Sequence, residues 1–328
     1  MSDSEADKHD EGSPLGPLIF LCTFPQLLVH EEQRTNIEYL LEHAHILIRT
    51  WHHTSPPFCE TDRRFIQVGW PFLERVWAHS CAYLALFEWY KRTECQDTIE
   101  GFVSDPINAP VLRLFRWALL ADSSAARLEW PANTPRPPSF PPPIGSSAHL
   151  KELVGAALLA QFEGRVTRMF QRAAAWMILH EMAHLLAGDR SMEGLDVLPS
   201  GIPPWLVEQG ADDWATGMSV GLRDWDTQAR KDELTVLGII AALVTLSSLT
   251  LMPFNRLGSG TRVHVETLTR LRRLLRHFFS EGDTAWIASS LFLELELYAQ
   301  SLPATQGTRF GTDNHLCNVY ENVGGTVI

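Results

Sequence analysis

The chain has 328 residues, 45% of them hydrophobic and 20% charged, which is typical of a folded globular protein with a substantial core. Its formal net charge of −12 and the lack of a long basic block argue against nucleic acid as a partner. The five cysteines are an odd number without a Cys-x-x-Cys spacing, so they suggest neither a disulfide framework nor a cysteine-bound zinc. Because the first residues lack the pattern of a signal peptide, we expect a cytoplasmic protein.

The N-terminal part of the chain predicts a tail followed by helices. Residues 1–14 are acidic and have almost no apolar side chains, so we expect them to be disordered. In residues 15–130 apolar side chains recur with the 3.6-residue period of a helix, which predicts an N-terminal helical region. The expected helices are Glu31–Trp51, Phe72–Lys91 and Pro110–Ala121, and the best candidates for strands are Arg64–Gly69 and Gly101–Ser104.

A proline-rich segment, residues 131–147, separates this region from the rest of the chain. Proline at this density cannot continue a helix and favours an extended backbone. We therefore expect either a linker or a strap that lies across the surface. The second region, residues 148–328, returns to helical periodicity, and we expect it to be a separate domain.

The most informative stretch of the second region is His180-Glu181-Met182-Ala183-His184. On a helix, residues four apart lie on the same face, so both imidazoles can reach a single zinc ion. Glu181 would then lie beside a water molecule at the metal, where its carboxylate can accept a proton. The apolar residues on both sides, from Ala173 to Leu186, favour a helix here.

A catalytic zinc site needs a third protein ligand, and Glu208 is the candidate. It lies 24 residues after His184, which leaves room for a loop and a returning helix. Asp212 follows four residues later on the same helical face, where it can accept the remaining N–H of a histidine ligand. A solvated acidic helix face would explain these charges, but it does not explain their position among Trp205, Leu206, Val207, Ala211, Trp214 and Ala215.

These five residues, His180, Glu181, His184, Glu208 and Asp212, resemble the pattern of the gluzincin metallopeptidases. The Glu-x-x-Ala-Asp form of the second motif looks like that of the Lit-type phage-exclusion peptidases and, more distantly, of the CAAX-prenyl-peptidase-like gluzincins. The resemblance covers about residues 165–275 and implies a mainly α fold with a zincin-like catalytic core. Together with the helical N-terminal region, it leads us to expect at most a small β-sheet beside the zinc helix.

The same families tend to carry a later His-Pro segment with an arginine six residues after the histidine. His264 and Arg270 have this spacing, although Val265 replaces the proline. By this resemblance His264 would polarise the scissile carbonyl or stabilise the oxyanion, and Arg270 would orient neighbouring groups. The alternative, in which His264 caps a surface helix, stays open.

Leu234–Phe254 is a run of 21 residues without a charge. Its length would allow it to cross a bilayer. A wholly buried helix of a large helical domain has the same appearance, and its threonines, serines and Pro253 favour that interpretation. We expect a core helix, with a membrane anchor as the alternative.

Taken together, these patterns predict a metallopeptidase with one Zn²⁺ ion, held by His180, His184 and Glu208, that hydrolyses a specific protein or peptide substrate. The resemblance to the Lit-type peptidases implies a regulated bacterial protease of the phage-defence type, with an activating or inhibiting protein partner. One alternative is a regulatory protease that acts on a repressor or a toxin partner. Another is a catalytically inactive binding module that contains zinc.

Overall fold

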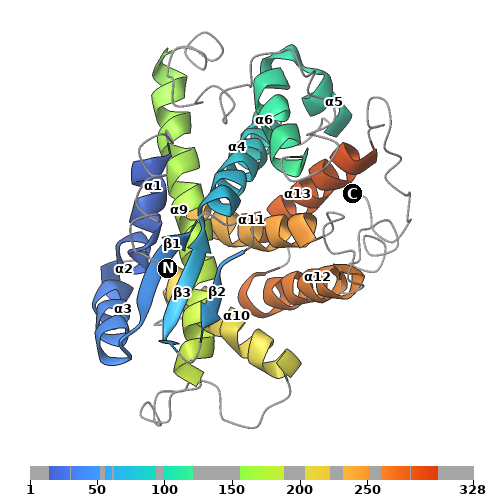
Figure 1. Cartoon of the computed structure of the whole chain (residues 1–328). Coiled ribbons are helices and arrows are strands. Elements are labelled where there is room, and N and C mark those ends of the chain that lie inside the picture. The colour runs from blue at the N-terminus through green and yellow to red at the C-terminus, as the bar shows by residue number, and fades with distance from the viewer. Residues whose placement is uncertain are drawn as a thin grey trace, which may run out of the picture. The chain divides into compact units, whose positions relative to one another are not determined.

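The computed structural model describes residues 15–29, 31–51, 56–60, 63–93, 99–120, 156–187, 204–221, 232–250, 260–280 and 282–301. Most of these residues are helical, and a single small sheet accompanies the helices (Figure 1). The prediction of a mainly α protein with at most a small sheet is therefore confirmed. The expected tail 1–14 and proline-rich segment 131–147 lie outside the described residues.

The elements follow one another along the chain with the helices in the majority. The helices are α1 (Gly16–Cys22), α2 (Pro25–Leu28), α3 (Glu31–His43), α4 (Trp70–Arg92), α5 (Ile99–Ser104), α6 (Ala109–Leu120), α9 (Ala156–Ala187), α10 (Pro204–Val220), α11 (Glu233–Thr250), α12 (Gly260–Phe278) and α13 (Thr284–Ser301). A 3₁₀ turn, η3 (Pro106–Asn108), precedes α6. The strands are β1 (Leu47–Trp51), β2 (Phe58–Glu60) and β3 (Phe65–Gly69).

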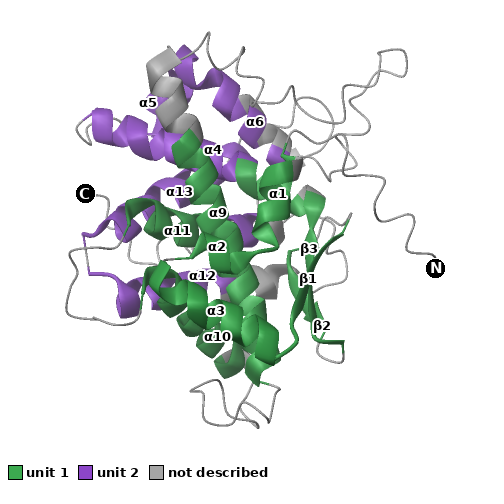
Figure 2. Ribbon diagram, turned by 90° about the vertical axis from the view of Figure 1, so that its left-hand side faces the viewer, with its two compact units in different colours: residues 1–77, 162–242 green, residues 78–161, 243–328 purple. Residues whose placement is uncertain are grey.

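The chain divides into two compact units, and each is made of two separate stretches of sequence (Figure 2). Unit 1 comprises residues 1–77 and 162–242, and unit 2 comprises residues 78–161 and 243–328. Unit 1 contains the sheet, most of α9 and all of α10. The sheet and the helix with both histidines of the motif, which come from different halves of the sequence, thus belong to one unit.

The sheet has the strand order β1-β3-β2, with β1 parallel and β2 antiparallel to the central β3. The prediction of a strand at Arg64–Gly69 is confirmed within one residue. The inner strand β3 buries Ile66 and Val68 completely, as expected for alternating β-branched residues of a central strand. Both other strands are edges, and β2 has only three residues.

The helix expected from Glu31 to Trp51 was predicted too long, because α3 ends at His43 and β1 begins at Leu47. The amide of His45 binds the carbonyl of Glu42 at 3.2 Å, and the amide of Ile46 binds the carbonyl of Leu41 at 3.0 Å. This pair of bonds is a Schellman motif, which ends a helix through a residue in the left-handed region. His45 occupies that position with a φ of 52°. Glycine is the usual residue there, so the sequence lacked the normal signal of a helix end.

The strand expected at Gly101–Ser104 is also wrong, since these residues belong to helix α5. The segment is short, and it buries one side chain, that of Phe102. Directly after it, the carboxylate of Asp105 accepts the amide of Ile107 at 3.0 Å and begins the 3₁₀ turn η3. Periodicity over four residues cannot separate a strand from a single helical turn.

Helix α11 covers most of the uncharged run Leu234–Phe254. All of its residues from Leu234 to Val244 are buried. A helix that is apolar on all faces is expected in a protein core. In the described part of the chain, no helix combines the length and the apolar character that crossing a membrane requires.

Unit 2 contains a buried group of polar side chains on α4, α11 and α13. The carboxylate of Glu296 accepts hydrogen bonds from the hydroxyls of Tyr83 and Ser248, the latter at 2.5 Å. Nδ1 of His79 lies 3.0 Å from the same carboxylate. All four side chains are buried, and the rings of Tyr83 and Phe292 stack on each other with centroids 4.3 Å apart. These bonds tie three helices of unit 2 together.

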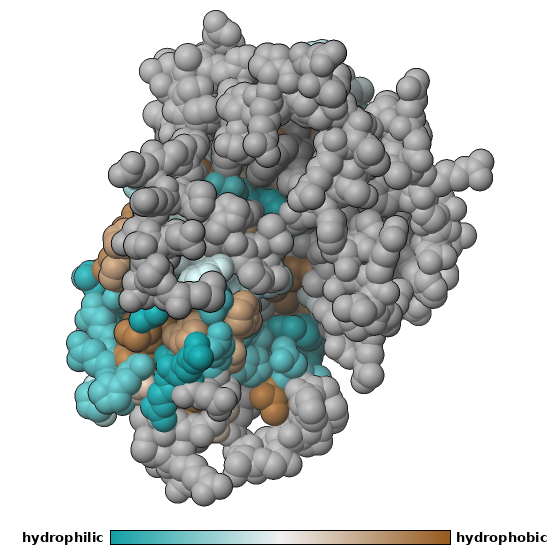
Figure 3. Space-filling model, in the orientation of Figure 1, coloured by the Kyte–Doolittle hydropathy of each residue, from teal (hydrophilic) through white to brown (hydrophobic). Residues whose placement is uncertain are grey.

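The described surface on the face of Figure 3 mixes hydrophilic and hydrophobic residues. Among the residues that the structure describes, most of the exposed large apolar side chains lie before residue 52. They are Phe20, Leu21, Leu27, Tyr39, Leu47, Trp51 and Ile107.

Candidate metal centre

The two histidines of the motif lie one turn apart on α9, as their spacing predicts. Nε2 of His180 is 3.1 Å from Nε2 of His184, and the two rings are nearly perpendicular at 85°. His180 is buried and His184 is half-buried. The nitrogen atoms therefore converge on one point close to the surface of unit 1.

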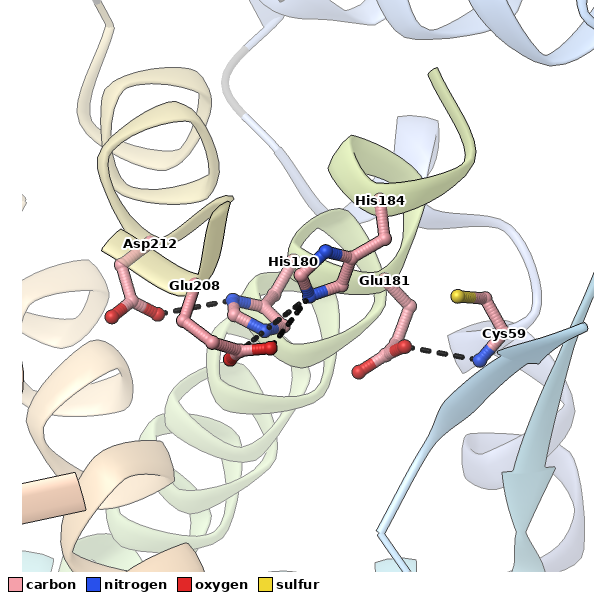
Figure 4. A network of polar contacts seen from close by, with 6 residues as sticks. All are labelled: Cys59, His180, Glu181, His184, Glu208 and Asp212. Carbon is pink, nitrogen blue, oxygen red and sulfur yellow. Dashed lines mark hydrogen bonds and ion pairs between the residues drawn. The ribbon is translucent and has the colours of Figure 1, made fainter. Parts of the chain in front are cut away.

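Helix α10 brings a carboxylate to the same point. Oε2 of Glu208 lies 3.3 Å from Nε2 of His180, and Oε1 lies 3.3 Å from Nε2 of His184. Figure 4 shows the carboxylate of Glu208 opposite both imidazoles. The side chain of Glu208 is 43% exposed, so the convergence point is open to solvent on this side. The structure thus brings His180, His184 and Glu208 together.

Asp212 contacts the other nitrogen of His180. Its Oδ1 lies 3.0 Å from Nδ1 of His180, and its side chain is fully buried. A buried carboxylate at this distance accepts the Nδ1 hydrogen, which leaves a lone pair on Nε2. The lone pair of His180 therefore points at the same place as the oxygens of Glu208.

Such a cluster of lone pairs and carboxylate oxygens is suited to binding a cation. His180, Glu181 and His184 each offer a ligand atom, all within 4.8 Å of one another, so this group could hold a metal ion. The carboxylate of Glu208 also lies near this group, with one oxygen 3.3 Å from Nε2 of His180 and the other 3.3 Å from Nε2 of His184. Four ligands at tetrahedral positions around zinc are about 3.3 Å apart, since each Zn–N or Zn–O bond is about 2.0–2.1 Å long. The distances between the two imidazoles and Glu208 agree with this value.

The carboxylate of Glu181 lies between the imidazoles and β2 (Figure 4). Its Oε2 accepts the main-chain N–H of Cys59 at 3.0 Å. Burial raises the pKa of the Glu181 carboxyl above its ordinary value, although the neighbouring His180 and His184 lower it. A carboxylate with a raised pKa is a better proton acceptor, which suits a general base.

Cys59 is a site residue that the sequence did not predict. Burial, and after it the charge of Glu181, raises the pKa of its thiol to about 12. The thiol therefore stays protonated at neutral pH. Cys59 is 122 residues before Glu181 in the chain, and no spacing or motif connects the two. Only the position of β2 in the fold brings them together.

The further residues expected from the resemblance, His264 and Arg270, both belong to α12 in unit 2. The side chain of His264 lies outside the described part of the chain. Arg270 is half-buried. The roles expected for these two residues stay predictions.

The family model described as Peptidase U49 matches residues 66–289, which is more than half of the chain. The matched range includes His180 and His184 of α9 and Glu208 and Asp212 of α10, and it begins after Cys59. Searches of curated proteins and of solved structures find no match.

Proposed function

Since the chain belongs to the peptidase U49 family, we propose that it is a zinc-dependent endopeptidase with its active site between α9, α10 and β2. The observation that carries this proposal is the convergence of His180, His184 and Glu208, whose ligand atoms lie 3.1–3.3 Å apart. Membership of a peptidase family supports peptide-bond hydrolysis, and the geometry supports a metal ion as the catalyst.

Zinc is the metal that this donor set favours. Two imidazoles and one carboxylate suit Zn²⁺, whereas Mg²⁺ and Ca²⁺ take oxygen ligands. A structural zinc ion would be enclosed by four protein ligands, often thiolates, while a catalytic one has three and an open position. Bound between these residues, zinc would supply a Lewis acid that polarises a carbonyl and acidifies a water molecule. The exposure of Glu208 leaves room for that water.

Glu181 would move the proton in the reaction. Its carboxylate accepts a proton from the attacking water as the oxygen forms a bond to the carbonyl carbon of the substrate. It then donates that proton to the leaving amine as the C–N bond breaks. The N–H of Cys59 holds one carboxylate oxygen of Glu181, and Asp212 fixes the tautomer of His180.

A polypeptide substrate is supported by the edge strand β2. Its partner in the sheet is β3, and the N–H of Cys59 points away from β3 to Glu181. The outer edge of β2 thus runs along the proposed general base. An extended peptide can pair with such an edge through main-chain hydrogen bonds. Pairing along this edge would place peptide on both sides of the cleaved bond, which supports cleavage within a chain rather than at its end.

The test compares the wild type with Glu181→Gln. We expect the variant to bind one zinc ion per chain and to lose cleavage by a factor of about 10³ or more. Mapping of new protein N-termini in cells that express either form would detect the activity and identify the substrate. Glu42→Gln, on the exposed side of α3, is the matched control and should cleave like the wild type. Equal sets of new N-termini from wild type and Glu181→Gln would refute the mechanism.

The biological role is proposed on the resemblance described above. We infer a protease that is restrained until a partner activates it, of the phage-defence type, in the cytoplasm. Cys22, Cys59 and Cys81 are free thiols, which suits a reducing compartment. New N-termini that arise only after infection would support this role, while constitutive cleavage of a repressor or toxin would favour the regulatory alternative. Zinc binding without any new N-terminus would favour a binding module.

A further inference from the structure

Three pairs of residues connect α9 and α10 in a regular series. His184 faces Glu208, His180 faces Asp212, and Trp176 faces Thr216. Each step moves four residues back along α9 and four residues forward along α10. The two helices are therefore antiparallel, and rows of residues spaced by four contact each other. The first two pairs belong to the proposed metal centre, and the third lies one turn further from it.

The third pair is a neutral hydrogen bond inside the protein. Nε1 of Trp176 donates to Oγ1 of Thr216 at 2.9 Å, and both residues have 0% exposure. The indole ring also lies against the imidazole of His180, with centroids 5.7 Å apart and planes at 30°. Trp176 thus contacts the neighbouring helix through its N–H and a metal-centre histidine through its ring.

We propose that Trp176 and Thr216 are a positioning pair that sets the register of α10 against α9 before the metal binds. The inference rests on the proposed zinc site. A shift of α10 by one residue moves its side chains about 1.5 Å along the axis and turns them by about 100°. Such a shift would remove both carboxylates from the histidines. Apolar contacts between helices have no direction, whereas the hydrogen bond of the indole fits one register only.

The other two pairs are less suited to this task in the metal-free protein. Water competes for Glu208, because its side chain is 43% exposed. The bond between Trp176 and Thr216 joins two uncharged side chains that are fully buried, so water does not compete for it. It can therefore hold the ligands in place while the site is empty of metal.

The experiment measures the affinity of the purified full chain for Zn²⁺ by competition with a chromophoric chelator. Thr216→Val keeps the shape of the side chain and removes the acceptor, and we expect zinc affinity to fall on the order of tenfold. Thr216→Ser retains the hydroxyl and should restore the affinity to within about twofold of the wild type. The absorption spectrum of bound Co²⁺, which reports coordination geometry, should change in Thr216→Val and return in Thr216→Ser.

Two controls separate positioning from general stability. Ile239→Val removes one buried methyl group from α11, and it should lower the melting temperature without changing zinc affinity. The double variant Trp176→Phe, Thr216→Val removes both polar atoms, so it leaves no unsatisfied buried group and keeps the fold even if Thr216→Val alone does not. We expect the double variant to bind zinc as weakly as Thr216→Val.

Wild-type zinc affinity in the double variant, or an equal loss in Ile239→Val, would overturn the positioning role while the proposed function stands. A wild-type chain that binds no zinc would overturn the proposed function and this inference together. Zinc binding by the wild type therefore distinguishes failure of the positioning role from failure of the proposed function.

Discussion

Nδ1 of His180 lies 3.0 Å from Oδ1 of Asp212, a carboxylate with 0% exposure. This contact directs Nε2 of His180 to the point where His184 and Glu208 converge. We predict that Asp212→Ala weakens zinc binding by about 10–100-fold, because the imidazole loses the acceptor that fixes its tautomer. Titration with a competing chelator measures the change. Asp213→Ala, on the next position of α10, is the control, and an equal loss there would argue against the role of Asp212.

Cys59 provides a chemical probe of Glu181. Burial and the charge of Glu181 raise the pKa of the thiol to about 12, so alkylation of the metal-free protein should be slow at neutral pH. In Glu181→Gln the thiol pKa falls, though burial still holds it above its ordinary value, and we predict several-fold faster alkylation by iodoacetamide. Mass spectrometry of the peptide with Cys59 gives the rate. Glu60→Gln should leave it unchanged, and equal rates in wild type and Glu181→Gln would contradict the prediction.

The raised pKa of Glu181 also predicts a pH dependence of stability. In the folded metal-free protein this carboxyl keeps its proton to a higher pH than in the unfolded chain, where the ordinary value is 4.5. Its contribution to stability is therefore complete below the unfolded pKa and is lost as the pH rises through the folded pKa. Urea denaturation at several pH values from about 4.5 to 7 should show the wild type losing stability relative to Glu181→Gln. A constant difference across this range would show that the carboxyl is not shifted.

Gly238 on α11 allows a test of the packing against α9. A Cβ at this position would lie 2.7 Å from Cβ of Arg172 and 2.8 Å from the carbonyl oxygen of Met169. We predict that Gly238→Ala lowers the free energy of unfolding by about 1–3 kcal/mol, because the helices must move apart. Gly164, on the exposed side of α9, has open space around it, and Gly164→Ala should stabilise by about 0.5–1 kcal/mol. Thermal or urea denaturation of both variants measures the change in stability. Destabilisation by both substitutions would show that close packing of α11 against α9 is not the cause.

Glu296 is the common acceptor of the buried polar group in unit 2. In Glu296→Leu the side chains of His79, Tyr83 and Ser248 lose this partner without access to water. We predict a loss of about 3 kcal/mol or more in the free energy of unfolding, measured by urea denaturation. Glu294→Leu, two residues earlier on α13 and half-buried, should cost clearly less. Similar losses in the two variants would mean that the buried group contributes little.

The relative positions of the side chains within the histidine motif and within the carboxylate motif could be predicted from the sequence, because each motif lies on a single helix. Residues four apart on a helix share a face, so the sequence determined that His180 and His184 point together and that Glu208 and Asp212 do so as well. The uncharged run that forms α11 was equally readable, since a helix that is apolar all round belongs in a core. The end of α3 could not be predicted from the sequence, because the left-handed residue that ends the helix is His45 and not the usual glycine.

What the sequence alone determined is therefore the chemistry of each helix face and the helical class of the fold. The tertiary structure decided which faces meet: it set α10 antiparallel to α9 in the register that joins Trp176 to Thr216, and it placed the N–H of Cys59 on Glu181 across 122 residues. Periodicity fixes where a side chain points from its own helix. Contacts between distant segments depend on packing and on hydrogen bonds between elements, and no local pattern encodes these.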